Sequence, residues 1–362
     1  MKITEKEVLQ ALSKVQDPDL KKDLVTLGMI QKIEITDEAL SFSVVLTTPA
    51  CPLKEVIKND CLKALEPILN GLKVNIDMTS DVTSIRSKSM ILPNVKNIIA
   101  VASGKGGVGK STVTANLAVA LAKSGASVGI IDADIFGPSM PTMFDCEHEQ
   151  PSMVEENGKN MLIPIEKYGV KLLSIGFLTP KDNAIIWRGP MASSALKQFI
   201  SDVKWGELDY LLIDLPPGTS DIHLTLVQSV PVTGAVIVTT PQKVAIADAQ
   251  KGLSMFKQPQ INVPLLGVVE NMAYFTPEEL PDNKYYLFGK EGGKKMAEKY
   301  EIPFLGEIPI VQSIRESGDS GYPAVMKEGI TEDAFNELAQ SVARQVAIRN
   351  ASKEKTKIVQ MN

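Results

Sequence analysis

The run Gly-Lys-Gly-Gly-Val-Gly-Lys-Ser at residues 104–111 constrains the fold of this chain more than any other stretch. It joins the apolar segment 98–102 to a segment with helical periodicity, as a phosphate-binding loop must. Glycines allow backbone N–H groups to approach a phosphate, and the next helix adds the positive end of its dipole. Lys110 supplies a charge for the β- and γ-phosphates, and the Ser111 hydroxyl is a hard ligand for Mg²⁺. The predicted ATP-binding residues of this loop are Gly104, Lys105, Gly106, Gly107, Val108, Gly109, Lys110, Ser111 and Thr112.

Lys105 is a second lysine in this loop, and a loop that closes around one nucleotide does not need it. One interpretation is a solvated loop lysine. However, the form Lys-Gly-Gly-Val-Gly-Lys-Ser resembles the deviant loop of the ATPase class that includes septum-site, plasmid-partition, nitrogenase-reductase and iron–sulfur carrier proteins. This resemblance implies a nucleotide-dependent homodimer in which Lys105 neutralises transition-state charge at the site of the other subunit.

Composition excludes several other classes of protein. The chain has 362 residues, of which 44% are hydrophobic and 22% charged, as is ordinary for a globular protein of two or three domains. Its net charge of −5 argues against general nucleic-acid binding, and no apolar run approaches the length of a membrane span. Because the N-terminal residues lack the apolar core of a signal peptide and the three cysteines are scattered, we expect a cytoplasmic protein.

Hydrophobic periodicity divides the chain into four parts. We expect a small α+β domain at 1–88, a linker at 89–97, a P-loop ATPase domain at 98–350 and a flexible tail at 351–362. The expected elements of the first domain are helices at 4–15 and 52–69 and strands at 30–35, 40–46, 74–78 and 82–85. The second domain should be a doubly wound, mostly parallel α/β sheet, with strands at 98–102, 127–131, 170–175, 210–214, 234–240 and 264–269.

Cys51 is the candidate cluster ligand of the first domain. It stands just before Pro52, and a thiol at the start of a helix has a lowered pKa. The alternative is a small residue packed at a turn. Asp17-Pro-Asp, Leu27-Gly28 and Thr48-Pro-Ala-Cys-Pro together resemble the assembly domain of iron–sulfur maturation proteins. Cys61 is expected in the core, and Cys146 in a surface loop with His148.

Three aspartates follow apolar strands near the predicted phosphate loop. Such strand ends meet at one edge of an open α/β sheet, where ligands bind. Asp214 precedes Pro-Pro-Gly and is placed to hold Mg²⁺ through water. The resemblance to the deviant-loop ATPases implies that Asp134 orients the attacking water and that Asp132 contributes to the Mg²⁺ shell. The catalytic candidates are therefore Lys105, Lys110 and Asp134, although the pair at 132 and 134 could simply cap the next turn.

The run Asp134-Ile-Phe-Gly-Pro-Ser resembles the Mrp/ApbC group of iron–sulfur cluster carriers. This resemblance implies that Asn271 binds the adenine base, the alternative being a strand-end cap; segment 311–317 is expected to close over the adenine side. Most members of the group have a Cys-x-x-Cys pair shortly after Asn-Met, but this chain has no cysteine after Cys146. Either Cys51 thiolates hold the cluster, or the protein keeps the ATP switch without one. A carboxylate pair at 278 and 279 is a further ligand candidate, less favoured than a solvated turn.

The sequence thus predicts an ATP-dependent dimeric switch. The resemblance adds an iron–sulfur cluster as cargo and implies apoproteins and assembly proteins as partners. Three alternatives stay open. A partition- or septum-type positioning ATPase would need a basic or membrane-binding surface, a P-loop kinase would not need Lys105, and a cluster-free scaffold would regulate iron–sulfur assembly without carrying a cluster.

Overall fold

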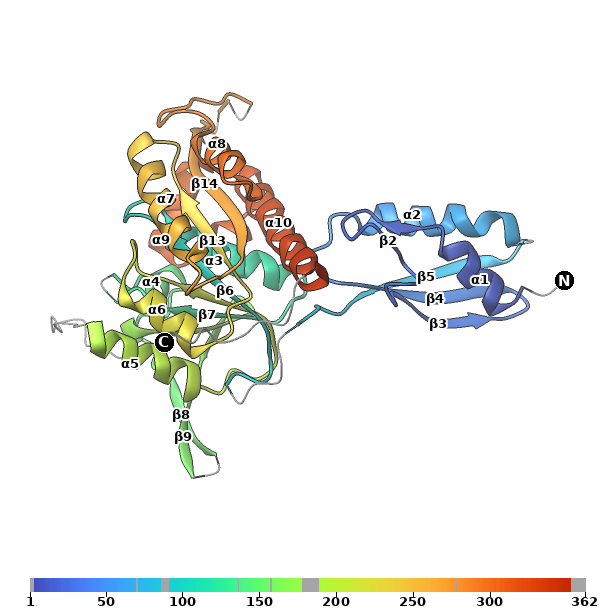
Figure 1. The fold of residues 1–362 in the computed structure, drawn as a ribbon, viewed down its shortest axis with the longest axis horizontal. Coiled ribbons are helices and arrows are strands. Elements are labelled where there is room, and N and C mark those ends of the chain that lie inside the picture. Colours follow the sequence, from blue (N-terminus) through green and yellow to red (C-terminus); the bar gives the residue numbers. More distant parts are fainter. Residues whose placement is uncertain are drawn as a thin grey trace. The chain divides into compact units, whose positions relative to one another are not determined.

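A computed structural model of the protein describes residues 3–69, 71–85, 91–135, 137–156, 158–177, 189–277, 279–280 and 282–352. The chain divides into two compact units (Figure 1). Of the described residues, the first unit contains 3–83 together with 347–352, and the second contains 84–346, with the gaps given above.

The first unit is a small α+β structure. Its sheet has the order β3-β4-β5, antiparallel between the first two strands and parallel between the last two. The side chain of Thr4 and that of Glu7 cap the start of the first helix reciprocally. The elements are α1 (Glu5–Leu12), β1 (Gln16–Asp17), β2 (Lys22–Asp23), β3 (Ile30–Ile35), β4 (Ala39–Leu46), α2 (Lys54–Leu65), η1 (Glu66–Ile68) and β5 (Lys73–Ser80).

Among the expected elements of this unit, two differ most from the structure. The helix expected at 52–69 is shorter, because Pro67 lacks a backbone N–H and the chain tightens into the 3₁₀ turn η1 after Leu65. The strand expected at 82–85 is absent: these residues are irregular. The reason is that β5 pairs with β4 only as far as Leu46 and Ser80, so the chain beyond has no strand to extend along.

The second unit is built on a sheet of eight strands in the order β10-β11-β7-β12-β6-β13-β14-β15. Every neighbouring pair is parallel except β10 and β11 at one edge, which confirms the doubly wound α/β class. The strands are β6 (Val95–Ser103), β7 (Val128–Asp132), β8 (Ser152–Glu156), β9 (Lys159–Ile163), β10 (Ile165–Lys167), β11 (Val170–Ser174), β12 (Leu208–Asp214), β13 (Gly234–Thr239), β14 (Leu265–Phe275) and β15 (Phe304–Ile310).

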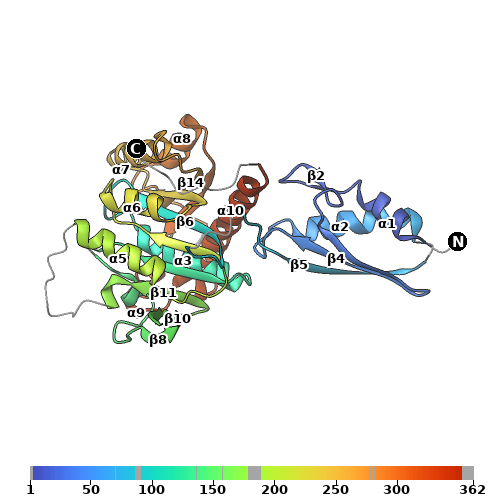
Figure 2. The same cartoon turned by 60° about the horizontal axis from the view of Figure 1, so that its bottom comes forward.

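Helices cover both faces of this sheet, so nearly every residue of its central strands is buried. Alternate residues of β6, such as Ile98 and Ala100, pack in one core cluster with residues of α5, α6, α7 and α8. Figure 2 shows α5 and α6 side by side. No residue of α3 belongs to that cluster, although α3 contacts β6, β7 and β12. The helices are α3 (Lys110–Lys123), α4 (Met140–Met143), η2 (Ile175–Phe177), α5 (Gly189–Ser201), α6 (Asp221–Ser229), α7 (Lys243–Lys257), α8 (Gly292–Lys299), α9 (Gln312–Ser320), η3 (Ala324–Met326) and α10 (Ile330–Ser352).

Several boundaries in this unit differ from those expected. Strand β6 begins at Val95, so residues 95–97 are not linker, and α10 continues to Ser352, two residues into the expected tail. Residues 353–362 lie outside the described part of the chain. Strand β14 continues to Phe275, so Asn271 lies within it rather than at its end.

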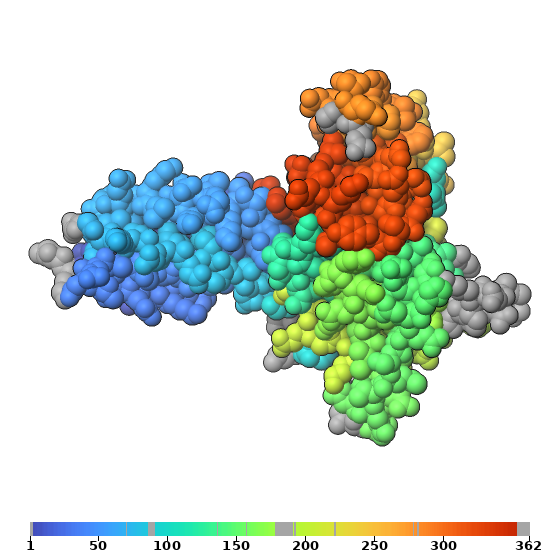
Figure 3. Space-filling view, turned by 180° about the vertical axis from the view of Figure 1, so that it is seen from behind, coloured from blue at the N-terminus to red at the C-terminus, as the bar shows by residue number. Residues whose placement is uncertain are grey.

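The hairpin β8–β9 projects from this unit (Figure 3). Among the described helices, none combines the length and apolar character that crossing a membrane requires.

Candidate nucleotide-binding site

The glycine-rich loop connects β6 to α3 at the carboxyl edge of the parallel strands. Gly107 and Gly109 have φ angles of 79° and 77°, a region that favours glycine. A Cβ atom on Gly104 would collide with the backbone of Asp248 and Ala249 in α7, so the loop packs tightly against that helix. Helix α3 then starts at Lys110 with its free N–H groups at the loop. This arrangement is suited to holding a phosphate group.

Asn271 contacts the glycine-rich loop through its side-chain amide. Its side-chain nitrogen donates a hydrogen bond to the backbone oxygen of Val108, at a distance of 2.8 Å. The same amide lies so close to Gly109 that a Cβ atom there would collide with it. The resemblance of the sequence implies that Asn271 binds the adenine base. In the structure one N–H of its amide is donated to the loop, which leaves the amide oxygen and the second N–H as the groups that could pair with a base.

Asp214, at the end of β12, is fully buried and connects the functional groups of the loop. Its Oδ2 atom accepts hydrogen bonds from Lys110 Nζ at 2.8 Å and from the Ser111 hydroxyl at 2.6 Å. Its Oδ1 atom accepts one from the Thr114 hydroxyl at 2.8 Å. The structure therefore brings Lys110, Ser111 and Asp214 together as the sequence predicts, and it adds Thr114.

The other two aspartates differ in their surroundings. Asp134 Oδ2 lies 3.5 Å from Lys110 Nζ, and its side chain remains 13% exposed at the edge of the site. Asp132 is fully buried, and its oxygens accept hydrogen bonds from the backbone N–H groups of Asp134 and Met140 and from the Ser174 hydroxyl. Burial raises the pKa of Asp132 to about 7, and the nearby charge of Asp214 adds to the rise. Asp132 thus holds the start of the loop that follows β7.

Lys105 is half-buried in the loop. Its backbone oxygen accepts a hydrogen bond from the Ser103 hydroxyl at 3.0 Å. Within the described ranges no acidic side chain forms an ion pair with its ammonium group. Lys110, by contrast, is 6% exposed and lies beside two carboxylates. The two lysines of the loop therefore have different environments: Lys110 is part of the site, whereas Lys105 forms no ion pair with an acidic group in the described part of the chain.

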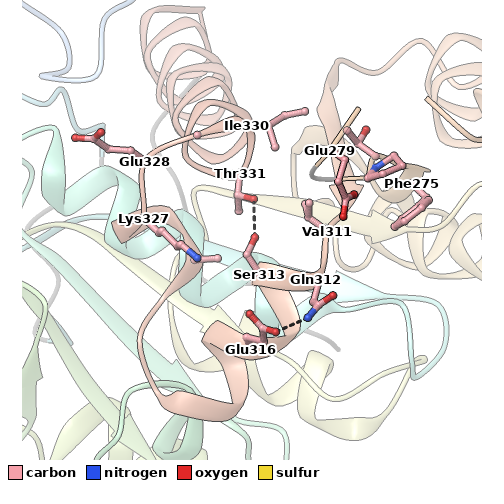
Figure 4. Close-up of a pocket in the computed structure, with 14 residues that line it drawn as sticks. Phe275, Glu279, Val311, Gln312, Ser313, Glu316, Lys327, Glu328, Ile330 and Thr331 are labelled. Carbon is pink, nitrogen blue, oxygen red and sulfur yellow. Dashed lines mark hydrogen bonds between the residues drawn. The ribbon is translucent and has the colours of Figure 1, made fainter. Parts of the chain in front are cut away.

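A cavity of about 330 Å³ lies between the end of β14, α9 and the start of α10 (Figure 4). Phe275, Val311 and the hydroxyl-bearing Ser313 and Thr331 are among its lining residues. A hydrogen bond links the wall of the cavity to α3, the helix that follows the phosphate loop. Ala324 lines the cavity, and the backbone N–H of the next residue, Val325, donates to the side-chain oxygen of Asn116 in α3 at 2.9 Å. Part of the segment 311–317, expected to close over the adenine side, thus lines a cavity that is linked to α3 through Val325 and Asn116.

The cysteines are separated in the structure. Cys51 is half-buried and lies three residues before Lys54, the first residue of α2, so it is not directly next to the start of the helix as expected from the sequence. Cys61 and Cys146 are buried, and burial raises the pKa of each thiol to about 12. The expected surface position of Cys146 is therefore wrong: Asp145 and His148 are exposed, but the thiol points inward, 3.6 Å from the oxygen of Pro141.

The carboxylate pair proposed after β14 finds no support as a metal site. Glu278 lies outside the described residues, and Glu279 is exposed. The described part of the chain holds no group of three or more His, Cys, Asp or Glu side chains arranged to bind a metal ion. His223 is not a candidate metal ligand either. Its ring is buried, and its Nδ1 accepts a hydrogen bond from the backbone N–H of Ser220 at 3.2 Å.

Sequence reasoning missed two hydroxyls of the site. Thr114 stands one helical turn after Lys110, so its position on the loop-facing side of α3 could have been derived from helical geometry. Ser174 ends β11 and pairs in register with Asp132 of β7. That contact depends on which strands are neighbours in the sheet, and strand order is not readable from the residues themselves.

A glycine-rich loop that opens a helix, with a strand-end aspartate bonded to its lysine and serine, defines the second unit as a P-loop NTPase. The family model of the NUBPL iron-transfer P-loop NTPase matches residues 94–347, and that of the iron–sulfur cluster assembly protein matches residues 5–78. The chain therefore belongs to the NUBPL iron-transfer family of P-loop NTPases, which includes iron–sulfur cluster carriers and assembly factors.

Individual relatives agree with the family. The iron–sulfur cluster carrier protein of Synechocystis is 47% identical over 347 residues, which cover 95% of this chain and 97% of that protein. The one from Deinococcus radiodurans is 45% identical over 349 residues, covering 95% and 96%. A solved nucleotide-binding protein from Archaeoglobus fulgidus in complex with ADP is 42% identical, with a TM-score of 0.57, over 66% of this chain and 91% of that chain. The resemblance to the Mrp/ApbC carriers is confirmed.

Proposed function

We propose that this protein binds and hydrolyses Mg-ATP at the loop 104–112 and uses the nucleotide to control a dimer that carries iron–sulfur clusters. The proposal that the loop binds a nucleotide depends on the hydrogen bonds that Asp214 accepts from both Lys110 and Ser111. Support also comes from the Archaeoglobus relative, whose structure contains ADP. In this arrangement Lys110 and the N–H groups of the loop bind the β- and γ-phosphates.

The residues present fit a magnesium ion. The Ser111 hydroxyl and the Asp214 carboxylate lie 2.6 Å apart at the end of a buried strand, and both are hard oxygen donors of the type that Mg²⁺ prefers. When bound, Mg²⁺ neutralises phosphate charge. The chain's own residues do the rest: Lys110 orients the phosphates, and Asp134, partly exposed beside Lys110, is the candidate that orients the attacking water. Asp132 is a weaker candidate for the metal shell, because its oxygens already accept protein hydrogen bonds.

The cavity near η3 is the proposed site for the nucleoside. Its volume of about 330 Å³ is in the range of small-ligand sites. Phe275 and Val311 offer apolar surface for a base, while the hydroxyls of Ser313 and Thr331 suit a ribose. Asn271 lies on the same strand as Phe275, and its amide oxygen and second N–H are the groups that remain for the base.

The dimer is proposed from Lys105. Its ammonium has no ion pair with the described residues of its own chain, as expected for a group that acts at a partner's phosphates. Light scattering after gel filtration tests this role. The slow-hydrolysing variant Asp134→Asn, saturated with Mg-ATP, should be a dimer, and the double variant with Lys105→Ala should bind ATP but stay a monomer. Lys110→Ala is the matched control and should fail to bind ATP. A dimer that survives Lys105→Ala, or a monomer in every case, contradicts the proposal.

The cargo is proposed from the family, since both carrier relatives align along nearly the whole chain. Cys51 is the candidate ligand because it is the half-buried thiol of the three, whereas Cys61 and Cys146 are buried. One cysteine per chain cannot hold a cluster alone, so two subunits or an additional thiol must contribute. Transfer of the cluster to apoproteins would follow when the dimer changes with nucleotide state.

The second candidate function is a cluster-free ATP-dependent scaffold for iron–sulfur assembly, favoured by the absence of any cysteine after Cys146. Anaerobic reconstitution with iron and sulfide separates the two. A carrier gives a visible charge-transfer band that disappears in Cys51→Ser and persists in Cys146→Ala, the control for the other domain. A protein that stays colourless under these conditions is the scaffold instead.

A further inference from the structure

Thr114 occupies a position that the proposed Mg-ATP chemistry does not account for. It is fully buried in α3, one turn after Lys110, and its hydroxyl lies 2.8 Å from Asp214 Oδ1 and 3.0 Å from the backbone oxygen of Lys110. A threonine hydroxyl has one proton and can fully satisfy only one of these acceptors. Because a carboxylate is the stronger acceptor, the proton is directed to Asp214.

The three donors around Asp214 divide its two oxygens. Lys110 and Ser111 both bind Oδ2, whereas Thr114 alone among these three binds Oδ1. The carboxylate is fully buried, so water does not replace a lost donor at no cost. Loss of the Thr114 hydroxyl would leave the carboxylate free to turn about its side-chain bond and carry Oδ2 away from Ser111. The hydroxyl therefore determines how Asp214 faces the loop.

We propose that Thr114 is a positioning residue that orients Asp214 toward Ser111 and thereby sets the affinity of the site for Mg²⁺. This inference rests on the proposed Mg-nucleotide site. It assigns to Thr114 a contribution to metal binding and none to phosphate binding, because Lys110 and the N–H groups of the loop contact phosphate whichever way Asp214 faces. The hydroxyl acts from the second turn of α3, outside the residues of the loop itself.

The test compares the affinity for ADP with excess Mg²⁺ and with EDTA, measured by titration calorimetry on the full chain. In the wild type Mg²⁺ should tighten ADP binding. In Thr114→Val, which keeps the side-chain volume but lacks the hydroxyl, this Mg²⁺ effect should shrink about tenfold while the affinity in EDTA stays within about twofold. Thr114→Ser should restore the effect. Ser124→Ala, which removes a hydroxyl at the far end of α3, is the control.

The possible outcomes distinguish a failure of the role of Thr114 from a failure of the proposed nucleotide site. A wild type that does not bind ADP overturns both. A wild type with a clear Mg²⁺ effect that is equally large in Thr114→Val overturns the role of Thr114 alone. An equal loss of affinity in Mg²⁺ and in EDTA shows that the hydroxyl only maintains the fold, and this also overturns the inference. Should Thr114→Val not fold, Thr114→Ala removes the same hydroxyl with a smaller, helix-compatible side chain and must show the same selective loss.

Discussion

The amide nitrogen of Asn271 donates a hydrogen bond to the backbone oxygen of Val108, 2.8 Å away, and so joins strand β14 to the tip of the phosphate loop. Asn271 is only 6% exposed, and its partner Val108 is also buried. A buried carbonyl that loses its donor costs free energy, because no water takes the donor's place. The loop conformation thus depends on a side chain more than 160 residues away in the sequence.

Replacing Asn271 with alanine should therefore weaken the binding of every ligand that uses the loop. We expect the affinity for ATP and for inorganic tripolyphosphate to fall together, by about three- to tenfold, the worth of one hydrogen bond. Competition against a fluorescent nucleotide measures both. If Asn271 serves only the base, the affinity for ATP falls and that for tripolyphosphate does not change.

Contacts within one element were predictable from the sequence, whereas contacts between elements were not. The capping of α1 by Thr4 and Glu7 and the buried face of α10, with Phe335 and Val342, are features of single elements, and local patterns indicate them. The carboxylates at strand ends were placed by the same reasoning. The engagement of Asn271 by the loop and the inward turn of Cys146 depend on packing between distant segments, so local patterns gave no signal of either.

The close packing of Gly104 against α7 gives a second prediction. In Gly104→Ala the new Cβ atom would collide with the backbone of Asp248 and Ala249, which cannot move aside as a flexible side chain would. We expect a loss of about 2 kcal/mol in the free energy of unfolding without nucleotide. Gly106→Ala is the matched control, since its Cβ atom would meet only Pro217 at 3.9 Å. Equal melting temperatures for the two variants contradict this account of the loop.

The burial of the cysteines predicts their reactivity. At pH 8 a thiol with a pKa of about 12, as for Cys61 and Cys146, is ionised in about one molecule in ten thousand. Cys51 is half-buried. A disulfide reagent such as DTNB should therefore titrate one thiol per native chain and three in denaturant, and none in native Cys51→Ser. Rapid reaction of two or three thiols in the native protein would show that the buried cysteines are accessible.

The last prediction concerns acid stability and His223. Burial lowers the pKa of its ring from 6.5 to about 4, since the charged form loses its hydration. The unfolded chain then binds the proton before the folded chain does, so the stabilisation is complete above about pH 6.5 and is lost as the pH falls toward 4. Between pH 7 and pH 5 this one group should cost about 2 kcal/mol. His223→Gln keeps an acceptor for the Ser220 N–H without titrating, so urea unfolding should show a smaller loss between these pH values in the variant than in the wild type. Equal losses in both proteins would mean that the ring is protonated as readily in the fold as in the unfolded chain.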